Sequence, residues 1–191
     1  MAHVSIIGTG NMGSALAGLV TKGGNTVETF NTSDTGKPVT GDVVILAVYY
    51  PAVRDVLAQR GEQLAGKVVV DITNPLNLET FDGLVVPADS SATAEIAAAL
   101  PSSTVLKAFN TNFAATLASG KVAGETTTVL IAGDDTDAKA LLAGIVTAGG
   151  LRAVDAGGLK RARELEALGL LQITLAATEK ISWTGGFAVA S

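Results

Sequence analysis

Three glycines near the start of the chain have the spacing G-x-G-x-x-G: they are Gly8, Gly10 and Gly13. Because glycine has no Cβ, a loop with this spacing can turn tightly and let an anion approach its backbone N–H groups. The chemistry that this permits is the binding of a phosphate or pyrophosphate at the start of a helix. The spacing alone is a weak signal, since glycine turns occur in many α/β proteins.

The segments around these glycines have the order that the motif requires. An apolar run over 4–7 predicts a buried strand, the segment 14–22 predicts a helix closed by Gly23 and Gly24, and 26–30 predicts a second strand. Together these pieces predict a dinucleotide-binding unit. Its pyrophosphate would lie on Gly8, Thr9, Gly10, Asn11, Met12 and Gly13.

The residues after the second predicted strand decide between NAD and NADP. A carboxylate there would bind the ribose 2′-hydroxyl of NAD and repel the 2′-phosphate of NADP. The chain has the neutral residues Asn31, Thr32 and Ser33, with Lys37 nearby, and these favour NADP(H), whereas Asp34 argues against it. The alternative is that these residues only form a turn.

Only the segment 32–41 separates the second strand from the next apolar run at 43–48. A crossover with its own helix needs at least about 10 to 12 residues, and an added strand needs more. We therefore predict that the unit which normally follows the second strand is missing. The second strand would then lie at an edge of the sheet.

Strands and helices are expected to alternate along the rest of the chain. Strands are predicted at 68–72, 104–109, 126–132 and 151–155, and helices at 52–63, 91–100, 113–119, 138–148 and 160–183. This order predicts one α/β domain over 1–191 with a Rossmann-like, doubly wound parallel sheet. The last helix is expected to be broken or bent near Gly169. Its apolar residues on two faces predict packing between layers or a homodimer.

The composition excludes several classes of protein. The chain of 191 residues has a net charge of −5 and no cluster of Lys and Arg, so neither nucleic acid nor an anionic membrane is an expected partner. It has no cysteine, which excludes disulfides and thiolate metal sites. We expect no signal peptide, because the first strand begins at residue 4, and no run of about 18 apolar residues could span a membrane. A cytoplasmic protein without a metal site is the expectation.

Ligands of open parallel sheets gather at the carboxyl ends of the strands. A dinucleotide on the glycine loop would extend toward the strands at 43–48, 68–72 and 104–109. The nicotinamide is therefore expected among Tyr49, Pro51, Asn74, Phe109 and Asn110. The asparagine amides could hold the nicotinamide amide or ribose, and Pro51 and Phe109 would form an apolar floor that excludes water. The alternative for the asparagines is that they cap strand-end turns.

No residue is assigned a catalytic role from the sequence. The only histidine, His3, precedes the first strand and is interpreted as a surface residue. Side chains that could transfer a proton are Tyr49, Tyr50, Asp71, Lys107 and Glu164. Packing is the alternative for one tyrosine and a salt bridge for Lys107. The residues interpreted as a solvated charged face at the start of the last helix are Arg161, Arg163, Glu164 and Glu166.

Three segments together resemble a known family: Gly8-x-Gly10-Asn11-Met12-Gly13, Asp71-x-x-Asn74-Pro75 and Leu106-Lys107-Ala108-Phe109-Asn110-Thr111. They are similar to the NADP oxidoreductases that use the deazaflavin coenzyme F420, and to the NADPH-binding domain of the six-transmembrane metalloreductases. The resemblance covers most of the chain and implies NADP(H) as the cofactor. It also implies that the nicotinamide side is lined by Ala47, Val48, Thr73, Asn74, Pro75, Phe109, Asn110 and Thr111.

Two departures from this family concern the 2′-phosphate and the electron acceptor. The deazaflavin enzymes carry a basic residue after the second strand, where this chain has Thr32 and Ser33. They also carry a histidine in the stretch matching 107–111, where this chain has Phe109 and is more similar to the metalloreductases, whose acceptor is a flavin. The resemblance thus implies hydride transfer between nicotinamide and a flavin- or deazaflavin-type acceptor, a reaction that needs little acid or base from the protein.

Two other functions remain open at this point. The segment 7–13 also resembles pyrroline-5-carboxylate reductase, which favours a small imine or carbonyl reductase, although that family has an additional helical domain. The second alternative is a non-catalytic module that senses NADPH. Turnover with a panel of acceptors separates the three.

Overall fold

The sheet is built around β1 (His3–Ile7), which lies between β2 (Thr26–Phe30) and β3 (Val43–Leu46). The computed structural model describes residues 1–190. The order of the seven strands is β2-β1-β3-β4-β5-β8-β9, with β4 at Val68–Asp71, β5 at Thr104–Lys107, β8 at Thr128–Ala132 and β9 at Arg152–Gly157. β1 to β5 are parallel, and every residue of β3 is buried, which accounts for its continuous apolar run.

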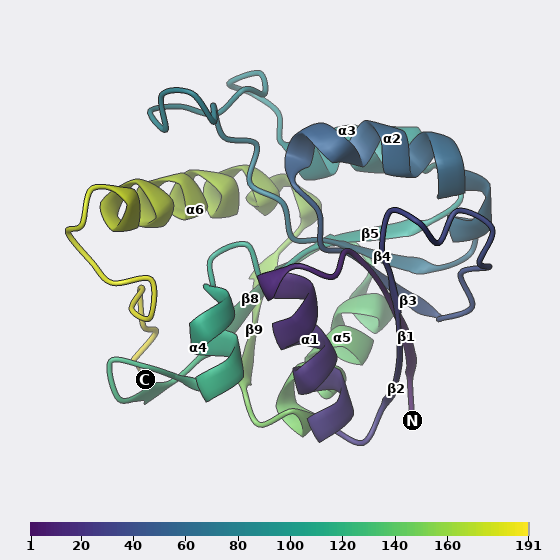
Figure 1. Cartoon of the computed structure of the whole chain (residues 1–191), viewed down its shortest axis with the longest axis horizontal. Coiled ribbons are helices and arrows are strands. Elements are labelled where there is room, and N and C mark those ends of the chain that lie inside the picture. The colour runs from purple at the N-terminus through teal and green to yellow at the C-terminus, as the bar shows by residue number, and fades with distance from the viewer. Residues whose placement is uncertain (191) are drawn as a thin grey trace.

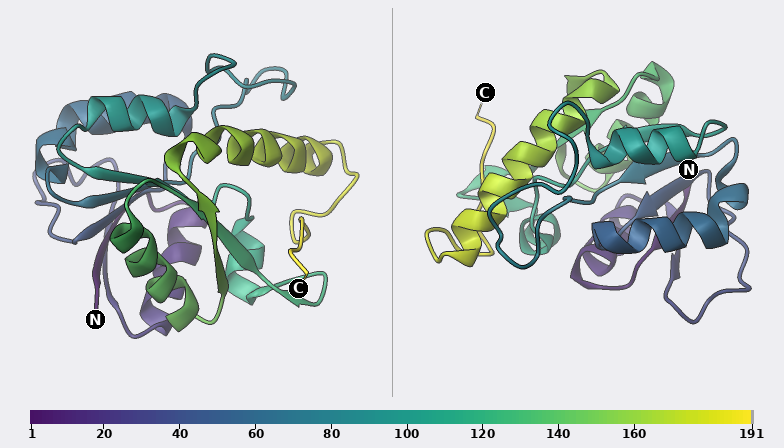
Figure 2. Two further views of the ribbon diagram at one scale, coloured as in Figure 1. Left: turned by 180° about the vertical axis from the view of Figure 1, so that it is seen from behind. Right: turned by 90° about the horizontal axis from the view of Figure 1, so that it is seen from above.

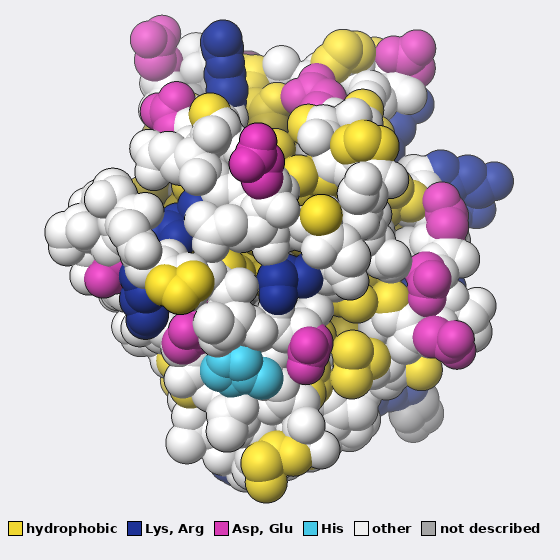
Figure 3. All heavy atoms as spheres, turned by 90° about the vertical axis from the view of Figure 1, so that its right-hand side faces the viewer, with side chains coloured by type: hydrophobic (Ala, Val, Ile, Leu, Met, Phe, Trp, Pro, Cys, Tyr) yellow, Lys and Arg dark blue, Asp and Glu magenta, His cyan; other side chains and the backbone are white. Residues whose placement is uncertain are grey.

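The predicted edge strand is confirmed. β2 pairs only with β1 in the described sheet, and the residues 32–41 contain no helix or strand. This loop is tied to the sheet, because Gly41 N donates to Ser5 Oγ at 2.9 Å and Thr40 N donates to Glu28 Oε1 at 2.8 Å. Figure 3 views the molecule from the right-hand side of Figure 1, where side chains of both charges are interspersed.

The predicted parallel sheet is confirmed for β1 to β5, whereas the last two strands run in the opposite direction. β8 pairs antiparallel with β5 through Lys107 and Ala132, and β9 is parallel to β8. The chain between β5 and β8 contains the six-residue α4 (Ala114–Ser119) and a hairpin of β6 (Lys121–Val122) and β7 (Glu125–Thr126). The connection 108–127 thus holds no long helix that runs back along the sheet, as the crossover to a parallel strand usually has.

Helices cover both faces of the sheet (Figures 1 and 2). On one face α1 (Asn11–Lys22), α4 and α5 (Thr136–Ala148) pack on residues such as Val43 and Ile45. On the other face α2 (Tyr50–Arg60) and α3 (Ala92–Ala99) pack on Val44 and Leu46. Alternate residues of one strand thus belong to two separate cores. Two short 3₁₀ helices, η1 (Gly61–Leu64) and η2 (Leu159–Arg161), follow α2 and β9.

The last helix, α6 (Ala162–Ala177), is shorter than the predicted 160–183 and runs unbroken through Gly169. Gly169 is buried, and a Cβ at this position would lie 2.2 Å from Asn74 Oδ1. The missing Cβ therefore lets the helix pack closely on the strand ends. Trp183 lies beyond the helix, with its ring centroid 5.0 Å from that of Phe113. Within residues 1–190, no helix has the length and apolar character needed to cross a membrane.

Candidate functional site

The three glycines of the loop after β1 have three different surroundings. Gly8 has φ +121°, and a Cβ there would lie 2.1 Å from the carbonyl oxygen of Ala47. A Cβ at Gly13 would lie 2.0 Å from the carbonyl oxygen of Gly8, whereas a Cβ at Gly10 would meet no heavy atom within 4 Å. Gly8 and Gly13 are therefore required by the fold of the loop, and Gly10 leaves open space above the backbone.

The start of α1 can bind an anion. The helix begins directly after Gly10, without a side-chain cap and without an acidic residue in its first turn. Ser14 N donates to Gly10 O at 2.9 Å, so the N–H groups of Asn11, Met12 and Gly13 have no partner within the helix. These N–H groups and the positive end of the helix dipole favour a phosphate at this position.

The residues after β2 form a hydrogen-bonded turn at the surface. Asn31 Oδ1 accepts from Ser33 N at 2.7 Å and from Ser33 Oγ at 2.5 Å, and Asp34 Oδ2 accepts from Asn31 N at 2.8 Å. The turn predicted as the alternative reading is therefore present. Asn31, Thr32 and Ser33 are nevertheless exposed, so their side chains remain accessible to a ligand.

Two basic residues lie beside this turn: Lys37, which was expected there from the sequence, and Arg60, which was not. Lys37 Nζ donates to Thr29 O at 3.1 Å and lies 4.4 Å from the centroid of the Phe30 ring. Arg60, the last residue of α2, lies 4.8 Å from the same centroid, donates to Lys37 O at 2.8 Å and also donates to Asp34 O. Arg60 is buried and fixes the loop, while Lys37 stays partly exposed.

The residues expected to contact the cofactor differ in accessibility. The exposed ones are Thr9, Gly10, Asn11, Asn31, Thr32, Ser33, Tyr49 and Pro51; the partly buried ones are Gly8, Met12, Ala47, Val48 and Asn74; and the buried ones are Gly13, Thr73, Pro75, Phe109, Asn110 and Thr111. The exposed and partly buried residues can touch a ligand directly. The buried ones can act only by holding the others in place.

Phe109 does not form the expected apolar floor. Its side chain is 1% exposed and belongs to the core that packs against α1 and α5. The residue has φ +61°, which is unusual for a residue other than glycine. This turn of the backbone directs the ring into the core, while Asn110 N donates to Ala108 O at 2.8 Å.

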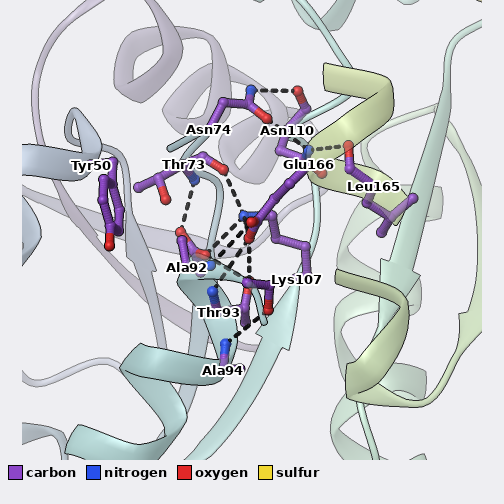
Figure 4. A network of polar contacts seen from close by, with 12 residues as sticks. Tyr50, Thr73, Asn74, Ala92, Thr93, Ala94, Lys107, Asn110, Leu165 and Glu166 are labelled. Atoms are coloured by element: carbon purple, nitrogen blue, oxygen red, sulfur yellow. Dashed lines mark hydrogen bonds and ion pairs between the residues drawn. The ribbon is translucent and has the colours of Figure 1, made fainter. Parts of the chain in front are cut away.

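Asn74 and Asn110 bond to one another beyond the ends of β4 and β5 (Figure 4). Asn74 Nδ2 donates to Asn110 O at 2.9 Å, and Asn110 Nδ2 donates to Asn74 Oδ1 at 2.9 Å and to Leu165 O of α6 at 2.8 Å. Among the described residues, the buried atoms Asn110 Oδ1 and Thr73 Oγ1 have no hydrogen-bond partner. Asn74, the more accessible of the pair, is thus oriented by Asn110 and by α6.

A buried ionic cluster lies behind this pair (Figure 4). Lys107 Nζ lies 2.9 Å from Asp71 Oδ2 and 2.9 Å from Glu166 Oε1, and all three side chains are 0% exposed. The salt bridge expected as the alternative for Lys107 is confirmed. The expectation of a solvated Glu166 is wrong, because α6 turns this residue toward the strand ends. Glu164 and Arg161 are exposed, as expected, and pair with each other at 3.0 Å.

Of the two candidate tyrosines, Tyr49 is 80% exposed, whereas Tyr50 is held by a carboxylate. Tyr50 Oη donates to Glu95 Oε2 at 2.5 Å, and partial burial, together with this hydrogen bond, raises the pKa of the phenol above its usual value. Tyr50 therefore stays protonated and points its proton at a carboxylate. His3 hydrogen-bonds to Thr26 Oγ1 and Thr40 Oγ1 at the β2 edge, in agreement with the surface role predicted for it.

Comparison with protein families gives a match over residues 26–75 to the family described as NADP oxidoreductase, coenzyme F420-dependent. The F420-dependent NADP reductase of Methanocaldococcus jannaschii is 33% identical over 149 residues, which are 76% of this chain and 66% of that protein. Metalloreductase STEAP3 of Rattus norvegicus is 36% identical over 130 residues, which are 68% of this chain and 25% of that protein. The chain thus spans only part of each relative's length.

Solved structures agree with the fold. A protein of Arthrobacter sp. FB24, described as a candidate F420-dependent NADP reductase, has a TM-score of 0.86 at 23% identity, with 100% of both chains covered. An imine reductase of Streptomyces aurantiacus has a TM-score of 0.64 at 17% identity, with 93% of this chain and 63% of that chain covered. At these identities the likeness establishes the Rossmann-like α/β fold alone.

Proposed function

The chain belongs to the family of coenzyme F420-dependent NADP oxidoreductases, and from this premise we propose that it transfers hydride between the nicotinamide of NADP(H) and a flavin- or deazaflavin-type acceptor. The observation that carries the proposal is the open backbone at Gly10. Gly10 lies at the uncapped start of α1, between Gly8 and Gly13, where a side chain would collide with the backbone. A pyrophosphate fits this place in charge and in shape.

The residues of the chain would bind and orient the cofactor. N–H groups of Asn11 and Met12 would hold the pyrophosphate, and Thr32, Ser33 and Lys37 would receive the 2′-phosphate. Asn74 would orient the nicotinamide amide or ribose at the ends of the strands. When bound, NADP(H) supplies the hydride, so the protein need supply only position and exclusion of water.

Two of the candidate proton donors, Tyr50 and Lys107, are held by carboxylates, which favours the proposed acceptor class. The phenol of Tyr50 is held by Glu95, and Lys107 lies inside the ionic cluster. Reduction of a carbonyl or imine usually requires a positioned acid. Transfer of hydride to a flavin-type ring does not require one from the protein.

The first experiment is calorimetric titration of the protein with NADPH and NADH. We expect tighter binding of NADPH, because the exposed side chains directly after β2 are neutral and Lys37 lies beside them, while the carboxylate of Asp34 is held at the N–H of Asn31. Equal or better binding of NADH would contradict the proposed cofactor.

The second experiment measures oxidation of NADPH with three acceptors: F420, flavin mononucleotide and a cyclic imine. Turnover with one of the first two supports the proposal. Turnover with the imine alone supports the imine-reductase alternative, and binding without any turnover supports an NADPH-sensing module. The variant Asn74→Ala should lower turnover, whereas His3→Ala, at the β2 edge, should leave it unchanged.

A further inference from the structure

Glu166 connects α6 to two other elements through a carboxylate that no solvent reaches. Its Oε1 lies 2.9 Å from Lys107 Nζ of β5, and its Oε2 accepts from Ala92 N at the start of α3 at 3.0 Å. Thr93 N also donates to Oε1, at 3.3 Å. The side chain of Glu166 therefore joins α6 to α3 and β5, two elements that lie far before α6 in the sequence (Figure 4).

The charges of the cluster are stabilised by one another and by the start of α3. It holds two carboxylates, Asp71 and Glu166, and one ammonium group, Lys107, all 0% exposed. The N–H groups and the positive dipole end of α3 supply the additional stabilisation of Glu166. Thr93 Oγ1 donates to Asp71 Oδ2 at 2.8 Å and completes the shell of that carboxylate. An unpaired charge at this depth would be strongly unfavourable, so the three side chains fix each other's positions.

The cluster reaches the predicted nicotinamide side by two routes. The first route is Lys107, whose Nζ donates to Thr73 O at 2.6 Å, and Thr73 directly precedes Asn74. Through α6, the carbonyl oxygen of Leu165 accepts from Asn110 Nδ2, and Gly169, one turn later, leaves free the space that the Asn74 amide occupies. Both routes end at the same pair of asparagines.

We propose that Glu166 is a positioning residue: by fixing α6 to Lys107 and to the start of α3, it orients the Asn74 amide toward the nicotinamide. This inference rests on the proposed function for its effect on turnover. The orientation of the asparagines is a property of the protein alone and can be measured without cofactor.

The test compares Glu166→Gln with the matched control Glu164→Gln, two residues away on the exposed face of α6. Glutamine keeps the shape of Glu166 but replaces one acceptor oxygen with a donor, so it cannot satisfy Lys107 and the α3 N–H groups together. Exchange of the Nδ2 protons of Asn74 and Asn110 is followed by NMR without cofactor. The dissociation constant of NADPH, the emission of its bound nicotinamide and kcat are then measured with the acceptor that supports turnover.

For Glu166→Gln we expect faster exchange at both asparagines, altered nicotinamide emission and a fall in kcat of about tenfold or more, because small displacements at a reacting centre have large effects on rate. The dissociation constant should stay within about twofold, since the glycine loop is untouched. Glu164→Gln should match the wild type in every measurement. If Glu166→Gln does not fold, Glu166→Asp is used in its place. Aspartate keeps the negative charge, but its side chain is shorter by one methylene, so its carboxylate lies farther from Lys107 and from the start of α3.

Unchanged exchange at Asn74 and Asn110 would overturn the inference, and so would faster exchange with unchanged kcat and emission. A loss of thermal stability with normal kcat well below the melting temperature would likewise show a structural role only. A wild-type protein that does not bind NADPH would refute the proposed function, and the effect inferred for Glu166 on turnover would fall with it. The exchange measurement would then still decide whether Glu166 orients the asparagines.

Discussion

Glycine is required for different physical reasons at two kinds of position in the loop after β1. At Gly8 and Gly13 a Cβ would overlap a backbone carbonyl oxygen, at 2.1 and 2.0 Å, and backbone cannot rotate away as a side chain can. At Gly10 there is room for a Cβ within the protein, and the backbone angles, φ −70° and ψ −169°, are open to any residue. Only a ligand would need glycine at that position.

The variant Gly10→Ala should therefore fold normally but bind NADP(H) at least about tenfold more weakly, which corresponds to about 1.4 kcal/mol. Gly13→Ala should instead lower the free energy of unfolding by about 2 to 4 kcal/mol. Calorimetric titration and chemical denaturation of both variants measure these effects. Normal NADPH binding by Gly10→Ala would mean that no phosphate lies over this residue.

The carboxylate of Glu28 links β1, β2 and the loop before β3. Its Oε1 accepts from Ser5 Oγ at 2.6 Å, from Thr40 N at 2.8 Å and from Thr40 Oγ1 at 3.0 Å. Partial burial acts to raise the pKa of Glu28, but these hydrogen bonds outweigh burial and lower the pKa below its usual 4.5. The charged form is therefore favoured by folding. The charged carboxylate therefore stabilises the fold fully at pH values above the pKa that Glu28 has in the unfolded chain. This stabilisation is lost as the pH falls through the lower pKa that Glu28 has in the folded protein.

Replacing Glu28 with glutamine should lower the free energy of unfolding at neutral pH by about 1 to 2 kcal/mol, because a neutral amide oxygen accepts these three hydrogen bonds more weakly than a carboxylate oxygen does. Below pH 4.5 the free energy of unfolding of the wild type should fall as Glu28 becomes protonated, so the difference in this free energy between the wild type and the variant should become smaller. Urea denaturation at neutral and acidic pH measures this difference, with the exposed Glu62→Gln as the control. A difference that is the same at both pH values would contradict the assignment.

A residue's role could be predicted from the sequence where its surroundings come from neighbouring segments, and could not where they come from distant ones. The glycine loop was predictable because its geometry depends on the adjacent strand and helix. Glu166 and Arg60 were not, since each owes its burial to segments distant in the chain: Glu166 to Lys107 and Ala92, and Arg60 to the loop 34–37. Neither position differs, by residue type or spacing, from the exposed charges beside it.

Among the elements, connection length was the most reliable guide. The ten residues of 32–41 were too few for a helix and a strand, and β2 lies at the edge as predicted. The direction of β8 was not predictable from its own residues, because an apolar run of β-branched residues fits a parallel or an antiparallel neighbour equally well. The direction agrees instead with the connection 108–127, which holds the short α4 and the β6–β7 hairpin in place of a long crossover helix.

The placement of α6 depends on one small residue. A Cβ at Gly169 would lie 2.2 Å from Asn74 Oδ1 and 3.0 Å from Asn110 Nδ2. Gly169→Ala should therefore displace the helix, lower the free energy of unfolding by about 1 to 3 kcal/mol and reduce turnover. The control is Gly18→Ala on α1, which is exposed with no atom within 4 Å of its Cβ and should raise stability by about 0.5 to 1 kcal/mol. Denaturation and turnover assays compare the two, and equal behaviour would show that α6 does not need this close approach.

At the scale of the whole molecule, the carboxyl ends of β1, β3, β4 and β5 share one edge of the sheet, and α6 lies beside that edge (Figures 1 and 2). The general layout followed from the alternation of strands and helices. The position of α6 did not, because apolar residues on two faces of a helix do not say which neighbours cover them. One face packs on the strand ends through residues such as Leu165 and Gly169.

The other face of α6 leaves apolar side chains uncovered, and this motivates the expectation of a homodimer. Leu171 of α6 is 51% exposed, and Phe81 and Val85 of the loop before α3 are 38% and 54% exposed. Thr174 Oγ1 donates to Phe81 O at 2.9 Å, so this loop and the helix form one surface. Exposed apolar groups that lie together, unlike single ones, commonly mark an interface. A twofold axis would place this surface against its own copy.

We therefore expect a dimer by light scattering at micromolar concentration, and we expect Leu171→Glu to convert it to a monomer without a change in secondary structure. A charge buried at such an interface would have no partner, and its desolvation would outweigh the apolar contacts of one residue. The matched control is Leu141→Glu on α5, which is 40% exposed but lies on a different face and should leave the dimer intact. A monomeric wild type would contradict the expectation, and a dimer that persists in Leu171→Glu would place the interface elsewhere than on α6.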